Sequence, residues 1–593
     1  MRQFFKYSFA TMFGIFLTFF FLMIIGAMIA GIASRGDKTV AKANSVLKTS
    51  FSKPIVDRGV PDGFNFQPGS FGPTESLGLN DILNNIEKAK TDDNIKGMYF
   101  ELTDIPAGMA SVEEIRKKLL EFKETGKFIV TYSEVMTQKA YYLASVADEI
   151  YLNPQGLVML NGFSVNWSSI KGMLDKLEVE PKIFYAGNFK SATEPLRYEK
   201  MSEYNKLQTR ELLNGFYDSF LENVAAGRNM SESQLNEIID ELKVQTASDA
   251  KKHKVVDKVA YIDQVYDNIK ERLAIESDED INFMSLSKYT DVKGEEKSFK
   301  KNKVAVVYAS GGIVDGQGED TEIGSARYVK ALRKVRKDDK VKAVVLRIDS
   351  GGGSALASEI IWRELELIKA KGIPVIASMG DVAASGGYYI ACNADTILAE
   401  SNTITGSIGV FGMMADVSKL YNNKLGITFD TVKTTKFSDF PTSAMVTRAF
   451  TEAEERIVQS SVDSIYLKFK SRVADGRNMN LDAVQEVAQG RVWTGTQAKE
   501  NGLVDVIGGL EMAINIAAEK AGLATDDYRL VNFPTVEEPF EKIMKEITGS
   551  SAKTQQEILK AELGSLFPYF EQIKSLEKMR GVQARLPFVI EVQ

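Results

Sequence analysis

Ser385 lies in the segment GDVAASGGYY, residues 380–389, between small residues and a Gly-Gly pair. An apolar run precedes it and a helix-compatible run follows it, so we expect a strand-to-helix turn. Small residues let the backbone turn sharply. The start of a helix just after the serine offers free N–H groups that stabilise a developing anion. The segment therefore fits an activated serine nucleophile, although a plain tight turn would use the same residues.

The chain has one histidine, His253, in the lysine-rich segment AKKHKVVD. A Ser-His-Asp triad would have to use this residue, but its neighbours indicate a solvated helix end. The known substitute for histidine is lysine, in a Ser-Lys dyad. Lysine can serve as a base because burial lowers its pKa. If Ser385 is a nucleophile, we expect its base to be a lysine, and several lysines remain open.

The composition excludes other kinds of site. The chain has 73 basic and 80 acidic residues and no basic stripe with interleaved aromatics, so nucleic acid is not an expected partner. Cys392 is the only cysteine, and with a single histidine the chain offers few zinc ligands. We therefore expect neither a metal site nor a cofactor.

The N-terminal segment over residues 7–33 has no charged side chain. At a rise of about 1.5 Å per residue, a helix of this length exceeds the ~30 Å hydrocarbon core of a bilayer. The apolar region of a cleavable signal peptide is shorter, usually about 7–15 residues. We therefore predict an uncleaved, single-pass transmembrane helix. Arg2 and Lys6 before the run nearly balance Arg35 and Lys38 after it, so charge does not decide the orientation.

The rest of the chain contains an internal repeat. The sequence GRNM occurs at residues 227 and 476, YYLA and YYIA at 141 and 388, and a T…AK…VD pattern at 246 and 494. The offsets are 249, 247 and 248 residues, and chance similarity does not keep so constant a register. The chain is therefore a tandem duplication, with a polar linker between the copies.

Each copy alternates short apolar strands with longer amphipathic stretches. In the second copy we predict strands at 304–309, 343–348, 374–379 and 396–399, and a helix at 359–371. Strands separated by helices pair in parallel through right-handed crossovers. We therefore predict an α/β fold for each of the two copies. The predicted domains are the anchor (1–34), the first repeat (35–276), the linker (277–302), the second repeat (303–522) and a C-terminal helical extension (523–593).

The two copies differ where chemistry would take place. Gln138 replaces Ser385 in the first copy, and TDIPA (103–107) replaces the glycine-rich DSGGG (349–353). Only the second copy is therefore a catalytic candidate. A bare glycine backbone can bring its N–H groups close to a substrate oxygen, as an oxyanion hole requires. A plain strand-to-helix connection also favours glycine. The loop therefore indicates an oxyanion hole only in combination with Ser385.

The chain resembles the long form of bacterial signal peptide peptidase A, also called protease IV. The resemblance covers residues 1–522 and rests on GDVAASGGYY, SNTITGSIGVFG (401–412), GNFKSATEP (187–195) and RVWTGTQAKENGLVD (491–505). It implies a ClpP/crotonase-like domain in each copy and a membrane-anchored serine endopeptidase. It further implies a homotetramer in the inner membrane, with extracytoplasmic domains, that degrades signal peptides left after cleavage.

The resemblance also implies a role for each site residue. It makes Ser385 the nucleophile, Lys190 the general base and Ser407 the hydroxyl that orients the lysine. The backbone N–H groups of Gly352 and Gly386 would form the oxyanion hole. The family usually has Ser-Pro-Gly-Gly where this chain has SGGG, and loss of the proline leaves that loop less rigid.

Lys436 is a competing base. It is the repeat counterpart of Lys190, at an offset of 246 residues. In short, single-copy relatives the base follows the serine by about fifty positions, which is where Lys436 lies. The match of GNFKSATEP to the long-form motif favours Lys190.

Two other functions stay open. A crotonase-like acyl-CoA enzyme would share the implied fold, since fold does not determine function. In a non-catalytic membrane scaffold, the glycines and the serine would serve packing alone.

The C-terminal tail from Thr535 ends in ARLPFVIEVQ. Such an apolar extended terminus can dock as a strand on a neighbour or in a groove, but we expect ordinary packing.

Overall fold

The computed structural model describes residues 6–7, 11–18, 21, 40–59, 64–67, 70–73, 77–292, 300–440, 445–524, 527–535 and 582–585. Most of the predicted anchor and most of the C-terminal extension lie outside these residues. Among the residues that are described, no helix is both long enough and apolar enough to cross a bilayer. The membrane anchor therefore stays a prediction.

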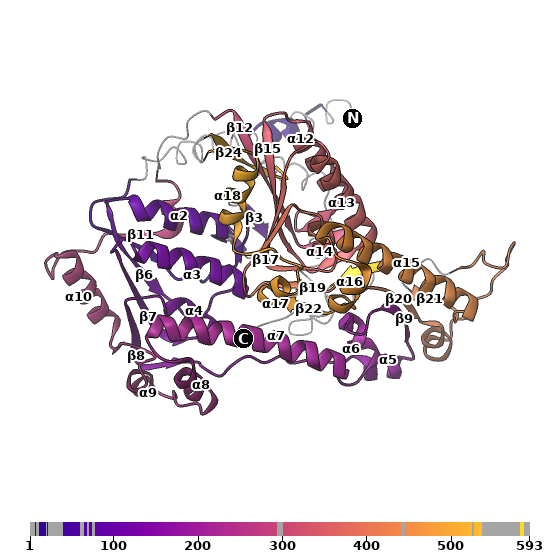
Figure 1. The fold of residues 1–593 in the computed structure, drawn as a ribbon, viewed down its shortest axis with the longest axis horizontal. Coiled ribbons are helices and arrows are strands. Elements are labelled where there is room, and N and C mark those ends of the chain that lie inside the picture. The colour runs from indigo at the N-terminus through magenta and orange to yellow at the C-terminus, as the bar shows by residue number, and fades with distance from the viewer. Residues whose placement is uncertain are drawn as a thin grey trace.

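The first copy folds around a six-stranded parallel sheet in the order β10-β8-β7-β6-β1-β11 (Figure 1). The strands are β1 (Ser45–Thr49), β6 (Ile95–Glu101), β7 (Phe128–Met136), β8 (Glu149–Val158), β10 (Lys258–Val259) and β11 (Phe283–Ser285). Side chains alternate between the faces of a strand. Met98 and Phe100 of β6 accordingly enter one core and Tyr99 the other, so both faces of the sheet are covered.

Helices cover these two faces unequally. One face packs against most of the helices of the first copy, and the other packs mainly against α10. The helices are α2 (Leu79–Thr91), α3 (Met109–Lys123), α4 (Gln138–Ala144), α5 (Lys171–Leu177), η1 (Ser191–Thr193), α6 (Glu194–Arg197), α7 (Glu203–Arg228), α8 (Glu232–Asp240), α9 (Ala247–Lys252), α10 (Ile262–Leu273) and α11 (Leu286–Tyr289).

The second copy repeats this plan around an eight-stranded sheet with the central order β22-β19-β17-β15-β12-β24, to which β18 and β23 add beside β17. Its strands are β12 (Asn302–Ser310), β15 (Val341–Ser350), β17 (Val375–Ala384), β18 (Thr396–Ala399), β19 (Ile404–Gly406), β22 (Val492–Thr494), β23 (Val506–Ile507) and β24 (Tyr528–Phe533). All pairs are parallel except β19 with β22. The predicted α/β fold and its tandem duplication are confirmed.

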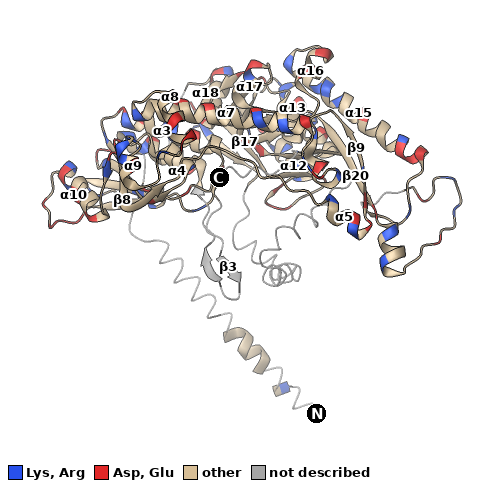
Figure 2. Cartoon of the chain, turned by 90° about the horizontal axis from the view of Figure 1, so that it is seen from below, with Lys and Arg blue, Asp and Glu red and all other residues tan. Residues whose placement is uncertain are grey.

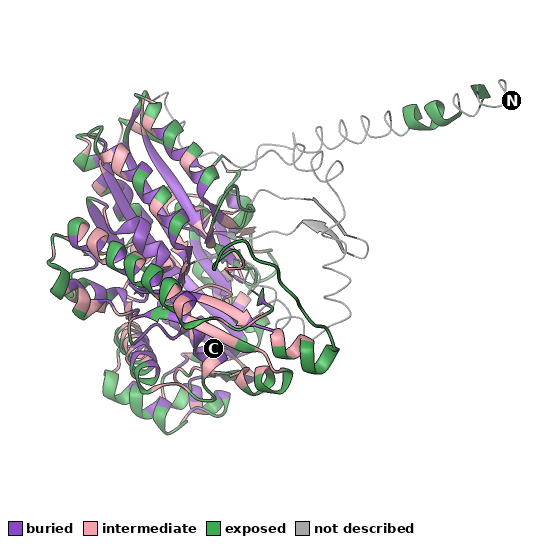
Figure 3. Ribbon diagram, turned by 90° about the vertical axis from the view of Figure 1, so that its right-hand side faces the viewer, coloured by how far each residue is buried: buried purple, intermediate pink, exposed green. Residues whose placement is uncertain are grey.

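Helices flank this second sheet as well: α12 (Ser325–Lys337), α13 (Ala355–Lys369), α14 (Gly386–Ala391), η2 (Leu420–Leu425), α15 (Glu452–Arg477), α16 (Leu481–Val487), α17 (Gly495–Glu500) and α18 (Leu510–Lys520). The helix predicted at 359–371 is α13, which begins four residues earlier because the Ser354 side chain caps it, accepting the Ala357 N–H. Charges of both signs intermingle on the outer helices (Figure 2), and the buried residues gather in the sheets (Figure 3).

Two edge strands fall outside the predicted repeat boundaries. β11 lies in the segment predicted as linker, and β24 lies in the predicted C-terminal helical extension. Each pairs with the first strand of its own copy, β1 or β12. Short edge strands beside polar linkers carry little periodicity, which is why the sequence pattern did not reveal them.

A third sheet contains strands from both copies. Its order is β14-β13-β16-β25-β20-β21, and β9 of the first copy also pairs with β20. The strands are β9 (Glu180–Ala186), β13 (Gly312–Val314), β14 (Glu322–Gly324), β16 (Gly352–Ser354), β20 (Val410–Asp416), β21 (Met445–Val446) and β25 (Val582–Arg585). Two small pairs complete the described strands: β2 (Ile55–Val56) with β5 (Leu77–Gly78), and β3 (Phe64–Gln67) with β4 (Ser70–Pro73).

The repeated GRNM sequence ends the long helices α7 and α15. Asn229 and Asn478 adopt the left-handed conformation there, with φ of 51° and 52°, which asparagine tolerates. A Cβ on Gly227 or Gly476 would lie 2.4 or 2.2 Å from a backbone oxygen of a neighbouring segment. The sequence thus recurs because each copy packs the same helix end against the same part of its fold.

Candidate active site

Ser385 occupies the turn between β17 and α14, as predicted. Its backbone has φ 55° and ψ −113°, a conformation that non-glycine residues rarely adopt. The turn is held by two backbone hydrogen bonds: the Ser385 N–H donates to the Gly406 carbonyl at 2.8 Å, and its carbonyl accepts the Tyr389 N–H at 2.8 Å. Strained backbone of this kind is concentrated at functional sites.

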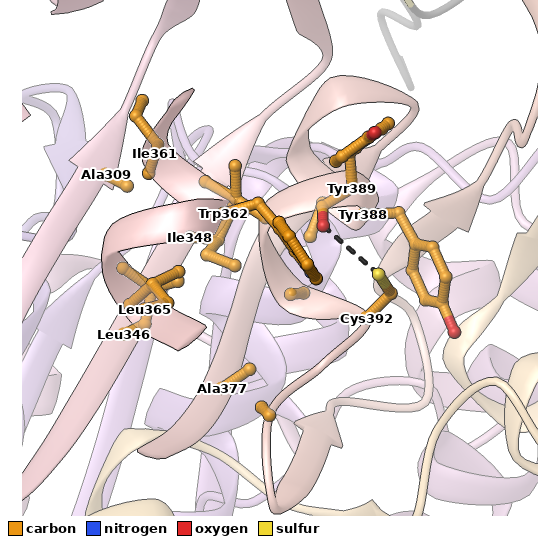
Figure 4. Close-up of a cluster of buried hydrophobic side chains, with 14 of the residues drawn as sticks. Ala309, Leu346, Ile348, Ile361, Trp362, Leu365, Ala377, Tyr388, Tyr389 and Cys392 are labelled. Atoms are coloured by element: carbon orange, nitrogen blue, oxygen red, sulfur yellow. Dashed lines mark hydrogen bonds between the residues drawn. The ribbon is translucent and has the colours of Figure 1, made fainter. Parts of the chain in front are cut away.

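A dense core fixes the helix that follows Ser385. Tyr388, Tyr389 and Cys392 lie at α14, beside Trp362 of α13 and Ile348 of β15 (Figure 4). The Cys392 Sγ donates a hydrogen bond to the Tyr389 carbonyl at 3.2 Å. Burial raises the pKa of the Cys392 thiol to about 12, which disfavours the reactive thiolate form. Close packing of this core leaves Ser385 little freedom to move.

Lys190 of the first copy reaches Ser385 of the second. Its Nζ lies 2.8 Å from Ser385 Oγ, 3.0 Å from Ser407 Oγ and 3.2 Å from the Ser407 carbonyl oxygen. Lys190 is 1% exposed, and both serines are 0% exposed. The structure thus brings together three residues that the sequence analysis had singled out, although 195 positions separate Lys190 from Ser385.

Burial lowers the pKa of the Lys190 ammonium group well below its ordinary value of 10.5. The cause is desolvation, which penalises the charged form. Among the described side chains, none supplies a counter-charge that opposes this effect. The environment therefore favours the neutral amine, the form that can accept a proton from a hydroxyl.

Two neighbouring residues of the second copy, Gln489 and Gly490, contact the segment that carries Lys190. Gly490 has φ +79°, and a Cβ at this position would lie 2.7 Å from the Lys190 Cβ and 2.7 Å from its backbone nitrogen. The Phe189 N–H donates to the Gln489 carbonyl at 2.9 Å. The sequence analysis did not single out Gly490, although it directly precedes the RVWTG segment. Only glycine combines this backbone angle with so close an approach.

We expect Gly490→Val to lower peptide hydrolysis about a hundredfold or more, because a misplaced catalytic group can cost that much. The measurement is kcat/KM on a peptide substrate, with the thermal unfolding midpoint as a check on folding. Gly502→Val is the matched control, because Gly502 also has a positive φ but has no neighbour within 4 Å of its Cβ position. Equal loss of activity in both variants would contradict a positioning role for Gly490.

The predicted oxyanion donors lie side by side. Gly352 has φ +92°, and the Gly386 nitrogen lies 2.6 Å from the place where a Gly352 Cβ would be. The Gly352 N–H donates to Ser350 Oγ at 3.1 Å. As the first residue of α14, Gly386 has an N–H that the helix itself does not satisfy. A side chain at Gly352 would therefore collide with the backbone of Gly386, so this position requires glycine.

The other candidates lie in different surroundings. Lys436 is exposed, and its Nζ lies 5.2 Å from the centre of the Phe437 ring. Gln138, the counterpart of Ser385, is buried, and its Oε1 accepts the N–H groups of Asn161 and Gly162 at 3.2 and 2.9 Å. The first copy thus uses this position to hold a loop. His253 caps the end of α9, in keeping with the helix end expected from its sequence.

Buried ion pairs and hydrogen bonds join the two copies. Arg347 of β15, which is 0% exposed, contacts Asp57 at 2.8 Å and Glu114 at 2.5 Å, both in the first copy. Asp381 of β17 accepts the N–H and the hydroxyl of Ser111 at 2.8 and 2.7 Å. An unpaired buried charge costs about 3–5 kcal/mol. Docking of the copies in any other way would break these pairs, so they help to position Lys190 against Ser385.

Comparison with known proteins shows the family of the chain. The family model "Peptidase family S49" matches residues 121–276 and 368–524. Protease 4 of Salmonella typhi is 35% identical over 92% of this chain and 89% of its own length. The chloroplastic serine protease SPPA of Arabidopsis thaliana is 36% identical over 75% of this chain and 66% of its own length.

Two further similarities are more limited. A candidate signal peptide peptidase SppA of Enterococcus faecium is 38% identical over 36% of this chain and 62% of its own length. A solved ClpP1 structure from Listeria monocytogenes, 14% identical, covers 35% of this chain and 94% of its own, with a TM-score of 0.24. That score is too low to support an argument about the fold.

The chain belongs to peptidase family S49, carries the matched family region twice, and is a serine peptidase.

Proposed function

We propose that the protein is a membrane-anchored serine endopeptidase with a Ser-Lys dyad divided between its two copies. Ser385 is the nucleophile, Lys190 the general base and Ser407 the residue that orients the lysine. The observation that carries this proposal is the 2.8 Å contact between Lys190 Nζ and Ser385 Oγ, both buried. Nucleophilic serines are activated by an adjacent base in this way.

The hydrogen bonds around Lys190 match what a neutral amine can offer. Such an amine has two N–H donors and one lone pair. The Ser407 hydroxyl and carbonyl oxygens, at 3.0 and 3.2 Å, can accept the two N–H groups. The lone pair then remains for the Ser385 hydroxyl. Lys436 offers no such arrangement, because it is exposed.

The reaction proceeds by acyl transfer. The Ser385 hydroxyl gives its proton to Lys190, and Oγ bonds to the carbonyl carbon of the peptide. The N–H group of Gly386 stabilises the oxyanion, and the N–H group of Gly352 joins it by exchanging its present partner, Ser350 Oγ, for the substrate oxygen. When the C–N bond breaks, the Lys190 ammonium group returns the proton to the leaving amine. Water, deprotonated by Lys190, then releases the acyl group and restores Ser385.

The proposed substrates are cleaved signal peptides and other membrane-associated peptides. The name of the Enterococcus relative and the uncharged run at residues 7–33 support this choice. We place the protein in the inner membrane, with the catalytic domains on the extracytoplasmic side, as a homotetramer. Membership of a peptidase family disfavours the acyl-CoA enzyme and the scaffold.

The pH dependence of acylation at Ser385 tests the dyad. Only a neutral lysine accepts a proton, so the rate should rise with pH and level off above the pKa of Lys190. Since burial lowers that pKa well below 10.5, the midpoint should fall below the value for an ordinary lysine. The measurement uses the full chain in detergent and a fluorophosphonate probe, from about pH 6 to about pH 10, with the adduct mapped by mass spectrometry.

Lys436→Ala serves as the control for this profile, because it removes the competing lysine and should leave the curve unchanged. A profile that is flat over this range would contradict a lysine base. An adduct on a residue other than Ser385 would contradict the assignment of the nucleophile.

A further inference from the structure

The C-terminal strand β25 lies between the two strands that flank the site. It pairs antiparallel with β16, where Gly353 lies opposite Ala584, and antiparallel with β20, where Phe411 lies opposite Gln583. β16 is part of the glycine-rich loop after β15, and β20 follows the segment that contains Ser407. In Figure 1 the strand is the short yellow segment beside α14. Residues 582–585, a segment close to the C-terminus, thus join the third sheet between β16 and β20.

The carbonyl oxygen of Ala584 lies where the two candidate oxyanion donors meet. It is 2.1 Å from the place where a Gly352 Cβ would be and 3.2 Å from the corresponding place at Gly386. Ala584 is 0% exposed and Gln583 is 5% exposed. The carbonyl of a scissile peptide bond must reach this same place for the glycine N–H groups to stabilise its oxyanion.

The contacts of β25 are those of an extended peptide bound by strand addition. In this mode main-chain hydrogen bonds supply affinity, and alternate side chains supply specificity. Ala584 and Val582, two residues apart, pack against the same apolar core. The guanidinium group of Arg585, on the other side of the Ala584 carbonyl, lies 3.6 Å from the Cβ position of Gly312. A small buried residue thus precedes the peptide bond whose carbonyl lies beside Gly352 and Gly386, and a basic residue follows it.

We propose that residues 582–585 occupy the substrate groove as an intramolecular inhibitor. The strand competes with peptides for β16, β20 and the oxyanion site. It also marks the path of a substrate, with a small residue before the scissile bond. This inference rests on the proposed peptidase function of Ser385 and adds to it a segment that regulates access.

Two truncations of the full chain test the proposal. A protein that ends at Gly581 lacks β25, and a protein that ends at Arg585 keeps it. A tethered segment acts at an effective concentration in the millimolar range. The first truncation should therefore raise kcat/KM for a peptide substrate about tenfold or more, whereas the second should leave it close to the full-length value. Equal activity of the two truncated proteins would overturn the proposal.

A point variant tests the same displacement of β25 in the full chain, in case the truncated protein misfolds. In Ala584→Trp, a large side chain replaces one that is fully buried, which should displace β25 and activate the full chain as truncation does. A synthetic peptide of residues 581–588, GVQARLPF, should then inhibit the protein that ends at Gly581. It should raise KM without changing kcat, whereas the same peptide with Trp in place of Ala584 should not inhibit. Absence of inhibition by GVQARLPF at millimolar concentration would overturn the proposal.

Hydrogen exchange separates this proposal from the proposed function. In a Ser385→Ala background, amides of β16 and β20 should exchange faster in the protein that ends at Gly581 than in the one that ends at Arg585. This readout needs no hydrolysis. Unchanged exchange would reject occupancy of the groove even in an active peptidase. Faster exchange without hydrolysis in any Ser385 form would support occupancy and reject the peptidase mechanism.

Discussion

Ser385→Ala should reduce peptide hydrolysis by a factor on the order of 10⁶, as loss of the nucleophile does in a serine protease. The variant removes one oxygen atom from a fully buried side chain whose Oγ contacts Lys190 at 2.8 Å. Alanine fits the same turn, so we expect the free energy of unfolding to change by less than about 1 kcal/mol. The measurement is kcat/KM on a signal peptide, with loss of labelling by the fluorophosphonate probe as a second readout.

Ser471→Ala is the matched control, because Ser471 lies on the outer helix α15, where its hydroxyl donates a hydrogen bond to the Leu467 carbonyl. This control should retain full activity. Turnover by purified Ser385→Ala above about a hundredth of the wild-type rate would contradict covalent catalysis by Ser385.

Lys190→Met should lower kcat/KM by about 10²–10⁴-fold, the usual contribution of a general base. Methionine is similar in length to lysine and apolar, so it suits a site that is 1% exposed. Lys436→Met is the matched control at the repeat counterpart, where the lysine is exposed, and it should retain activity. The residual activity of Lys190→Met should lose the rise with pH, which a purely structural role for the lysine would not remove.

A double variant tests whether the two residues act as one unit. Ser385→Ala with Lys190→Met should be no less active than Ser385→Ala alone, since members of a catalytic unit are strongly non-additive. If Lys436→Met were inactive and Lys190→Met active, the base would lie within the second copy. The first copy would then be structural.

The sequence by itself determined the local features of this protein. Small residues around Ser385 predict the sharp turn between β17 and α14, and this turn is present. The near-constant offset of repeated patterns predicts two copies of an α/β fold. Both results follow from short-range rules, namely backbone sterics and the periodicity of apolar residues. The replacement of Ser385 by Gln138 in the first copy could also be seen from the sequence.

The base could be narrowed to a lysine from the sequence, but motif resemblance alone favoured Lys190 over Lys436. Tertiary structure places Lys190 against Ser385 through contacts between the copies. β9 pairs with β20 over seven residues, and Gly490 leaves room for the lysine backbone. Such contacts join residues about two hundred or more positions apart, and no local pattern encodes them. The two buried ion pairs of Arg347, with Asp57 and with Glu114, are of the same kind.

The C-terminal strand β25 is a second feature whose presence was visible in the sequence but whose position only the tertiary structure determined. An apolar extended tail was visible in the sequence, with ordinary packing as the expected role. The structure instead places Val582–Arg585 between β16 and β20, with the Ala584 carbonyl beside Gly352. Strand addition uses main-chain hydrogen bonds, which every sequence can form. The residues of the tail therefore do not predict which strands it will pair with. The docking position is determined by the assembled sheet, in which β16 and β20 leave a place for one more strand beside the glycine-rich loop.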